Sequence, residues 1–293
     1  MLMAEWLEMW YNTYVDGNEH SPSTRAMYRR SIDVVPDWLG KIDLAAVTPL
    51  DCYRHIHARA REFPRAAQLD RIMLTRALLV AVKCGLRQPI VLDEDTCPTP
   101  RHVAKKQDVL DARQLALYMR TAPTAAPVTH ALLLMCACGL RRGEALGMTW
   151  DCIDLQAGVM QVKQQRLRVS GNYLVVPPKT SAGKRMVCVS PALAAALRAM
   201  PRQLGGWVVD TTPERLQREH LAVIRAAGLP HVTIHGLRHS IATVAAAAGM
   251  PIKLLQAELG HSSYKITADL YADHVQDSAA AMRAVYERSC VGG

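Results

Sequence analysis

Aromatic side chains are scarce in this chain of 293 residues: they account for 5% of it, whereas hydrophobic residues account for 50%. The apolar content is therefore mostly Ala, Leu, Val and Met, which favours a mainly helical protein. Long apolar runs are also missing, because the longest, 131–140, is broken by Gly139 and is typical of a buried helix. The first ten residues lack the basic region and cleavage site of a signal peptide. We expect a cytoplasmic protein with no membrane partner.

Cysteines spaced for redox chemistry or for zinc are missing as well. The eight cysteines are scattered, and Cys136 and Cys138 are too close together for a CxxC motif. That pattern is typical of reduced thiols in a core. Acidic residues are outnumbered by basic ones, so the formal net charge is +9. This charge favours a polyanionic partner, and for a helical protein that partner is most often nucleic acid.

The first ninety residues predict a bundle of four helices. The segment 4–15 carries apolar residues at helical spacing, and Ser21-Pro22 and Thr48-Pro49 are each typical of a helix start. The fourth helix is predicted over 66–83. The composition then changes sharply at 93–107, DEDTCPTPRHVAKKQ, which is typical of an interdomain linker. These features predict a helical domain over 1–92, a linker over 93–107 and a second domain over 108–293.

Basic residues crowd the third and fourth predicted helices, and two lysines end the linker. The pattern is typical either of a solvated face or of a surface that follows the phosphates of DNA. Both interpretations remain open from the residues alone. The residues concerned are Arg54, Arg59, Arg61, Arg65, Arg71, Arg76, Lys105 and Lys106.

Strand patterns occur in the second domain, between 158 and 189. The segments VMQVK, YLVV and MVCVS alternate or are rich in β-branched residues, and turn residues separate them. They predict one small antiparallel sheet of three strands. Its last turn carries Lys179 and Lys184.

The stretch 233–271 concentrates chemical groups suited to phosphate. His235 and Arg238 are spaced three residues apart, and Thr233 is a candidate N-cap, so both would lie near a helix N-terminus that favours an anion. A guanidinium can hold two phosphate oxygens at once. His261 and Tyr271 follow, and they add a second proton carrier and a phenol nucleophile.

Zinc chemistry is a rival interpretation of the same stretch. His235 and His239 are spaced four apart, as in the helix of zinc proteases, and His261 would be a third ligand. That motif needs a Glu where this chain has Gly236, and Arg238 would repel the metal. We therefore expect no metal and no other cofactor, and we interpret His239 as a residue that supports its neighbours.

Five segments resemble, in order, those of the tyrosine recombinases, also called phage integrases. They are CGLRRGEALGMTW (138–150), PPKTSAGKR (177–185), HGLRHSIAT (235–243), LGHSS (259–263) and ITADLYADHV (266–275). The likeness extends over about 108–288. It implies a helical, SAM-like core-binding bundle of four helices followed by a mixed α+β catalytic domain. It also implies a site-specific recombinase that cuts and rejoins DNA through a 3′-phosphotyrosyl intermediate, without ATP or metal.

The resemblance assigns roles to individual residues. CGLR also occurs at 84–87, but only the second copy leads into a helix, which favours Arg141 as a phosphate ligand, held by Glu144. Lys179 is preferred to Lys184 as the proton donor to the leaving oxygen. Tyr264 lies too near His261 in the sequence to be the nucleophile, and Tyr286 comes too late in the chain for that role. The implied catalytic residues are Arg141, Lys179, His235, Arg238, His261 and Tyr271.

Within the family, the closing segments are most similar to integrases of phages and mobile elements. The first arginine segment comes early, which predicts a minimal integrase without an arm-binding domain. The resemblance further implies core-type attachment sites on double-stranded DNA, a homotetramer on that DNA, association with the nucleoid, and a directionality factor as a candidate partner. Three alternatives stay open: a chromosome or plasmid dimer resolvase, a type IB topoisomerase, and a non-catalytic DNA-binding regulator.

Overall fold

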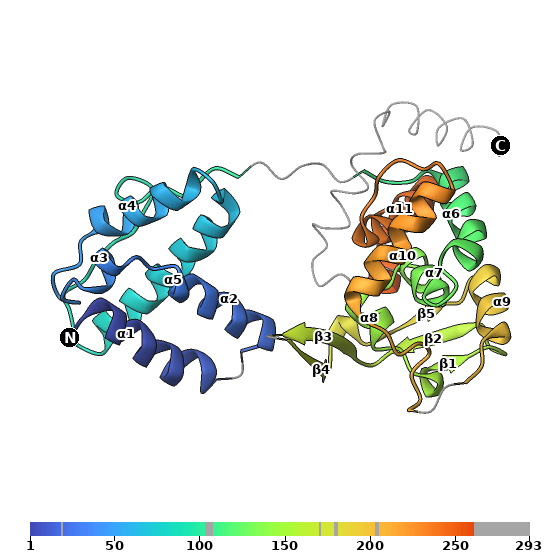
Figure 1. The fold of residues 1–293 in the computed structure, drawn as a ribbon, viewed down its shortest axis with the longest axis horizontal. Helices are drawn as coiled ribbons and strands as arrows, with labels where there is room; N and C mark the ends of the chain where they lie inside the picture. The colour runs from blue at the N-terminus through green and yellow to red at the C-terminus, as the bar shows by residue number, and fades with distance from the viewer. Residues whose placement is uncertain (19, 103–107, 170, 179–180, 203–204, 261–293) are drawn as a thin grey trace, which may run out of the picture. The chain divides into compact units, whose positions relative to one another are not determined.

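The computed structural model describes residues 1–18, 20–102, 108–169, 171–178, 181–202 and 205–260. The chain divides into two compact units, Met1–Lys105 and Lys106–Gly293. Both are built mainly of helices, and the second also holds small antiparallel sheets (Figure 1). The prediction of a mainly helical protein with a small sheet component is therefore confirmed.

The first unit is a helical bundle packed on the long helix α5. Its core includes Trp6, Leu7 and Trp10, the apolar stripe predicted in the first helix. The helix predicted to begin at Ser21-Pro22 ends at Asp33, and a separate short helix follows Pro36, because a proline cannot continue a helix. The count of four helices is therefore not matched. The elements are α1 (Met3–Trp10), the π-helical η1 (Tyr11–Asp16), α2 (Pro22–Asp33), α3 (Asp37–Gly40), α4 (Pro49–Ala60) and α5 (Pro64–Lys83).

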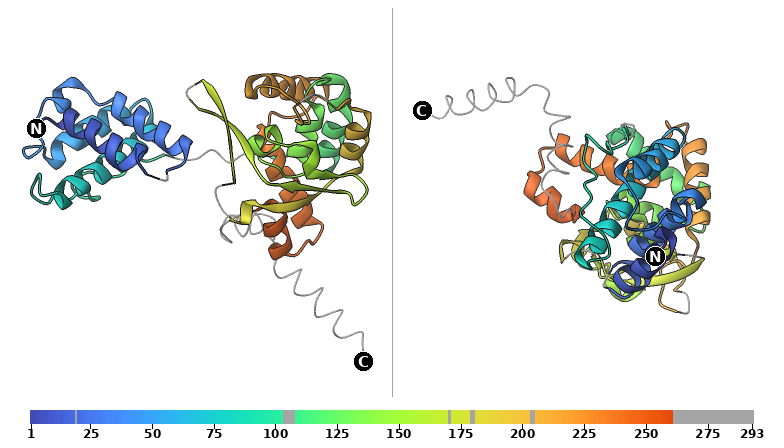
Figure 2. Two further views of the ribbon diagram at one scale, coloured as in Figure 1. Left: turned by 90° about the horizontal axis from the view of Figure 1, so that it is seen from below. Right: turned by 90° about the vertical axis from the view of Figure 1, so that its left-hand side faces the viewer.

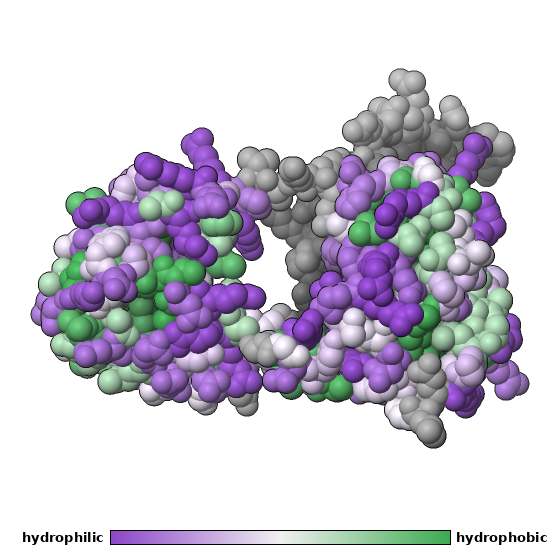
Figure 3. Space-filling view, in the orientation of Figure 1, coloured by the Kyte–Doolittle hydropathy of each residue, from purple (hydrophilic) through white to green (hydrophobic). Residues whose placement is uncertain are grey.

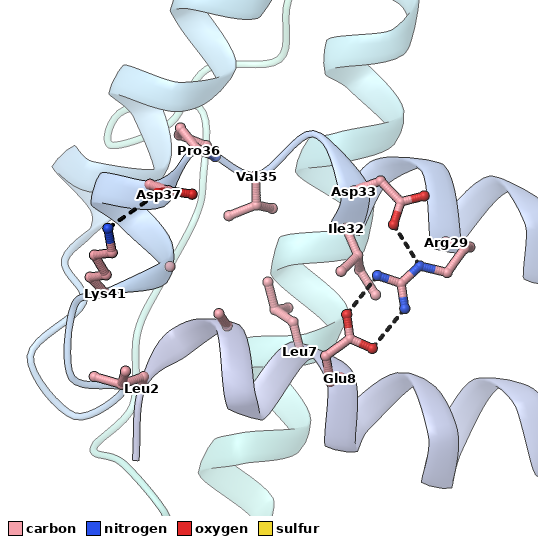
Figure 4. Close-up of a pocket in the computed structure, with 12 residues that line it drawn as sticks. Leu2, Leu7, Glu8, Arg29, Ile32, Asp33, Val35, Pro36, Asp37 and Lys41 are labelled. Carbon is pink, nitrogen blue, oxygen red and sulfur yellow. Dashed lines mark hydrogen bonds and ion pairs between the residues drawn. The ribbon is translucent and has the colours of Figure 1, made fainter.

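Capping residues begin α2 and α4 where the sequence predicts. Ser21 accepts a hydrogen bond from the amide of Thr24, and Thr48 and Asp51 form a reciprocal capping box at the start of α4. Between α1 and α2, Arg29 donates to both carboxylate oxygens of Glu8, at 2.6 and 2.7 Å, and to Asp33 at 2.8 Å. Glu8, Arg29 and Asp33, joined by these bonds, line part of a pocket (Figure 4).

The start of the predicted linker lies against the first unit. Cys97 is fully buried there. Arg71 donates to the carbonyls of Cys97 and Leu92, at 2.7 and 2.8 Å, and Gln68 donates to the carbonyl of Pro100. Contacts of this kind make 92–100 part of the packing of this unit rather than an exposed tether.

The second unit is organised around α7 (His130–Ala137), whose residues after His130 are all buried. It contacts five other helices of the unit, so the apolar side chains on all of its faces are packed against protein. The others are α6 (Ala112–Ala125), α8 (Arg142–Leu146), α9 (Pro191–Ala199), α10 (Pro213–Ala226), α11 (Ile234–Ala247) and α12 (Ile252–Leu259), with 3-10 turns η2 (Trp150–Cys152) and η3 (Ser181–Gly183).

Two separate sheets replace the single sheet that the sequence predicts. One has the order β1-β2-β5 and is antiparallel, and Met160 lies opposite Val187 in it. The other is a hairpin of β3 and β4. The prediction was wrong for YLVV because Gly171, at φ +86°, permits a tight local turn that pairs it with the preceding strand. The strands are β1 (Ile153–Asp154), β2 (Val159–Val162), β3 (Gln165–Val169), β4 (Asn172–Val176) and β5 (Arg185–Cys188).

The two sheets differ in how they are buried. In β5, Arg185 and Val187 are buried while Met186 and Cys188 are exposed, so one face lies on the core. The first four residues of β4 are exposed. The hairpin projects from the edge of its unit (Figures 1 and 2). It therefore contributes little to the core of this unit.

A buried hydrogen-bonded chain ties α6 and α10 to the segment that leads into α11. Tyr118 Oη lies 2.8 Å from His220 Nδ1, and His220 Nε2 lies 2.8 Å from the carbonyl of Val232. Nε2 must carry the proton for that second bond, so Nδ1 accepts from the tyrosine. Both side chains are fully buried.

Replacing Tyr118 by phenylalanine should lower the free energy of unfolding by about 1–3 kcal/mol, because His220 Nδ1 would lose its donor while buried. Urea denaturation followed by circular dichroism measures the change. Tyr173→Phe is the matched control, since that ring lies on the exposed hairpin. Equal stability of Tyr118→Phe and wild type would contradict the argument.

No helix within the described ranges is long and apolar enough to cross a membrane. Hydrophilic residues are spread over the visible face of each unit, with apolar residues between them (Figure 3).

Candidate functional site

The N-terminal part of α11 carries three of the predicted side chains. α11 begins at Ile234, because Thr233 Oγ1 accepts a hydrogen bond from the amide of Gly236 at 2.9 Å. His235 and His239 lie one turn apart, with ring centroids separated by 4.6 Å and ring planes at 89°. His235 is exposed and His239 is half-buried. Arg238, between them in sequence, is buried.

Arg238 is 1% exposed and holds two backbone carbonyls. Its Nη1 donates to the carbonyl of Gly139 at 2.6 Å, and its Nη2 donates to the carbonyl of Leu259. Neither partner carries a formal charge. The positive charge of Arg238 is thus taken out of water, and no carboxylate of the described residues is hydrogen-bonded to it.

Arg141 stands at the N-cap of α8, next to the end of α12. Its Nη1 donates to Glu144 Oε1 at 2.7 Å, its backbone amide donates to Oε2 at 2.8 Å, and its Nη2 donates to the carbonyl of Gly260 at 2.9 Å. The contact between Arg141 and Glu144 is the one that their spacing predicts. The side chain of Arg141 remains 37% exposed, so it can still meet a ligand.

Arg185, which was not among the predicted site residues, joins this cluster. Its Nη1 and Nη2 donate to the two oxygens of Glu144, at 3.1 and 2.9 Å. One signal could have found it: in an alternating strand, Arg185 shares a face with Val187, so it must point into the core. An arginine at such a position needs a buried partner.

Three guanidiniums and one carboxylate set the charge of the site. Burial, followed by the positive charges of Arg141 and Arg185, lowers the pKa of Arg238 from 12.5 to about 9. Burial alone would raise the pKa of Glu144, but the bonds and charges of Arg185 and Arg141 outweigh it, so that pKa is lowered. The cluster therefore carries excess positive charge and favours an anion.

His235 is suited to accept a proton. Although the His235 side chain is exposed to solvent on one side, neighbouring protein removes part of its hydration. This loss of hydration, followed by the positive charges of His239, Arg238 and Arg141, lowers the pKa of His235 from 6.5 to about 4. The ring is thus neutral at pH 7, with a free lone pair. A neutral imidazole beside guanidiniums can take a proton while the guanidiniums hold an anion.

The same shift predicts how stability depends on pH. Between pH 6.5 and 4, the unfolded chain protonates His235 while the folded protein does not, so the free energy of unfolding falls as pH drops through that window. We expect His235→Gln to reduce this loss, measured by urea denaturation at pH 7 and at pH 5. The exposed His57 provides the control substitution, His57→Gln. A pH dependence identical to that of wild type in His235→Gln would contradict the expectation.

Several predicted residues lie outside the described part of the chain: Lys179, His261, Tyr271, Lys105 and Lys106. Within the first unit, Arg59 pairs with the buried Asp70 at 2.6 Å, and Arg71 holds backbone carbonyls as described above. Arg65 donates to Gln68, Arg76 donates to Tyr28 Oη, and Arg54 lies over the ring of Trp38. Arg54, Arg61, Arg65 and Arg76 are exposed.

The described residues contain no group of three or more His, Cys, Asp or Glu side chains arranged to hold a metal ion. His235 and His239 lie in ring contact, at right angles, rather than around a common point. Their role as zinc ligands gains no support from this geometry.

A family model and known relatives match this chain. Residues 108–277 match the model of the phage integrase family. The chain is 27% identical over 218 residues to the transposase from transposon Tn916 of Enterococcus faecalis, which covers 65% of this chain and 52% of that protein. It therefore spans about half the length of that relative.

Solved structures show the same fold. The Tn1549 transposon integrase (residues 82–397) in complex with circular intermediate DNA aligns with a TM-score of 0.78 at 19% identity, over 97% of this chain and 99% of that one. A lambda integrase tetramer bound to a Holliday junction aligns with a TM-score of 0.67 at 18% identity, over 94% and 79% of the two chains. With more than half of its length matched by the family model, this chain belongs to the phage integrase family.

Proposed function

We propose that the protein is a site-specific recombinase of phage or mobile-element type, which cuts and rejoins double-stranded DNA through a tyrosine nucleophile. One observation carries the proposal. Arg141, His235 and Arg238 come from two segments that are about a hundred residues apart, yet they meet in one positively charged site of a chain in this family. A neutral base beside guanidiniums is the arrangement that phosphoryl transfer requires.

The proposed reaction uses only side chains of this chain. Tyr271 Oη attacks the scissile phosphorus, the bond from phosphorus to the 5′-oxygen breaks, and a 3′-phosphotyrosyl link remains. His235 accepts the phenol proton, and Lys179 gives a proton to the departing 5′-oxygen. Arg141, Arg238 and His261 bind the non-bridging oxygens. Attack by a 5′-hydroxyl of another strand reverses these steps and completes the exchange, with no need for ATP or metal.

We propose that different segments of the chain bind DNA and catalyse the reaction. The bundle of 1–92 binds core-type sites, with Arg54, Arg61, Arg65 and Arg76 as phosphate contacts, because these side chains are exposed. The segment 93–107 connects it to a catalytic domain over 108–293. A homotetramer on DNA is the proposed working form, and the lambda integrase tetramer supports it. A directionality factor is a further proposed partner.

Trapping tests the proposal directly. The protein is incubated with genomic and random-sequence duplexes that carry nicks, so that the short strand bearing the freed 5′-hydroxyl diffuses away and rejoining is prevented. A DNA-linked species on a denaturing gel, mapped to Tyr271 by peptide analysis, is the expected result. Sequencing the trapped DNA then identifies the site.

The alternatives predict different outcomes. A type IB topoisomerase would relax supercoiled DNA without exchanging strands between two duplexes. A dimer resolvase would exchange strands only between sites on chromosomal or plasmid dimers. Tight DNA binding without any adduct would favour a non-catalytic regulator and would contradict the proposal.

A further inference from the structure

The C-terminal end of α12 is held by three arginines, each on a different one of three successive carbonyls. Arg185 Nε donates to the carbonyl of Glu258 at 2.7 Å, and Arg141 Nη2 donates to that of Gly260 at 2.9 Å. Arg238 Nη2 donates to the carbonyl between them, that of Leu259. The last carbonyls of a helix lack partners within it and carry its negative dipole end, so guanidiniums stabilise them. We call this arrangement the carbonyl clamp.

Arg185 connects the clamp to Glu144. The side chains of Arg185 and Glu144 are 5% and 3% exposed, and they meet through two hydrogen bonds. Arg185 also donates to the carbonyl of Gly183 at 3.2 Å. Because each of its three nitrogens is already bonded to protein, Arg185 has no nitrogen to offer a substrate. Any influence it has on the reaction must pass through the groups that it holds.

Glu144 is the group that transmits this influence to Arg141. Its Oε1 accepts from Arg141 and from Arg185, at 2.7 and 3.1 Å, so one carboxylate fixes the direction of both guanidiniums. Removing Arg185 would leave this buried carboxylate with only half of its charged partners. Glu144 would then hold the Arg141 guanidinium less rigidly, although the charge of Arg141 would be unchanged.

The backbone at Gly260 allows the end of α12 to lie close to Arg185. Gly260 has φ +63°, and a Cβ there would lie 2.7 Å from the carbonyl oxygen of Ala182 and 2.8 Å from Arg185 Cδ. The side chain of Glu258 adds a second tie, because its Oε1 accepts from the amide of Cys188 on β5 at 2.8 Å. The end of α12 is therefore fixed to both ends of β5, through Arg185 and through Cys188.

We propose that Arg185 is a positioning residue for strand cleavage, which directs Arg141 through Glu144 and holds the end of α12 through the carbonyl of Glu258. The proposal rests on the proposed recombinase function. A shift of about 1 Å in a group that binds the reacting phosphate costs on the order of a hundredfold in rate. Loss of the contacts made by Arg185 is therefore expected to slow cleavage more than it weakens DNA binding.

Arg185→Lys tests this, because lysine keeps the positive charge but cannot join Glu144 and the carbonyl of Glu258 at once. Covalent attachment is measured in a single turnover at saturating nicked DNA, together with the Kd for DNA and the Tm. We expect attachment to slow by about 10- to 100-fold while the Kd changes by less than about threefold. The control is Arg215→Lys, which alters the pair of the exposed Arg215 with the half-buried Glu219 on α10. It should attach DNA at the wild-type rate.

A double variant distinguishes positioning from general structural damage. If Arg185 acts through Glu144, then Arg185→Lys combined with Glu144→Gln should be no slower than the slower single variant, whereas independent defects would multiply. Multiplying effects, or a wild-type rate in Arg185→Lys, would overturn the proposal. If Arg185→Lys does not fold, Glu144→Gln decides alone, and an unchanged attachment rate overturns it. Failure of wild-type protein to form any adduct would instead refute the recombinase function.

Discussion

Tyr271→Phe should bind DNA with an affinity within about threefold of wild type and should never become covalently attached to it. The substitution removes one oxygen, which is the proposed nucleophile, and leaves the guanidiniums and the charge of the protein unchanged. Attachment to a nicked duplex, followed on a denaturing gel over hours, measures the effect. This is the largest effect that we expect from any single substitution.

Two other tyrosines in the same part of the sequence provide the controls. Tyr264→Phe and Tyr286→Phe remove the same atom close by along the chain, and both should attach DNA at the wild-type rate. Attachment that survives in Tyr271→Phe, or disappears in Tyr264→Phe, would show that the nucleophile was assigned to the wrong residue.

Arg238→Lys should slow attachment by about 10²- to 10³-fold, the loss typical of removing one preorganised donor to a developing oxyanion. A lysine keeps the charge, but it is shorter and has one nitrogen, so it cannot hold the carbonyls of Gly139 and Leu259 and also meet a phosphate. Because Arg238 is buried, water cannot replace the lost bonds easily. The rate of the single-turnover step at saturating DNA reports this loss.

Arg225→Lys is the matched control for that experiment. Arg225 lies on α10, is exposed and donates to the carbonyl of Leu221 in its own helix. It should attach DNA at the wild-type rate. If Arg238→Lys stays within about threefold of wild type, then Arg238 serves the packing of α11 rather than the phosphate.

Local features of the site could be predicted from the sequence. The N-cap at Thr233 and the contact between Arg141 and Glu144 each depend on residues three apart, and the geometry of a helix start fixes such contacts. The start of α4 at Thr48 follows the same reasoning. In each case the interaction is decided within one turn of chain.

Contacts across the chain could not be predicted. The pair of Arg185 and Glu144 joins residues 41 positions apart, and Arg238 reaches Gly139, 99 positions away. The partner at Gly139 is a backbone carbonyl, which every residue possesses, so no side-chain pattern marks it. The division of the strands into two sheets also escaped prediction, because YLVV pairs with β3, a segment that was not predicted as a strand.

The carbonyl clamp has a consequence for how the protein can change during evolution. A carbonyl cannot be removed by a substitution, so the information that specifies the clamp resides in Arg141, Arg185 and Arg238 and in the shape that Gly260 permits. Exposed side chains along α12, such as Leu254, are consequently free to drift without disturbing it. The outer surface of this helix can thus acquire new contacts while the site beneath it keeps its geometry.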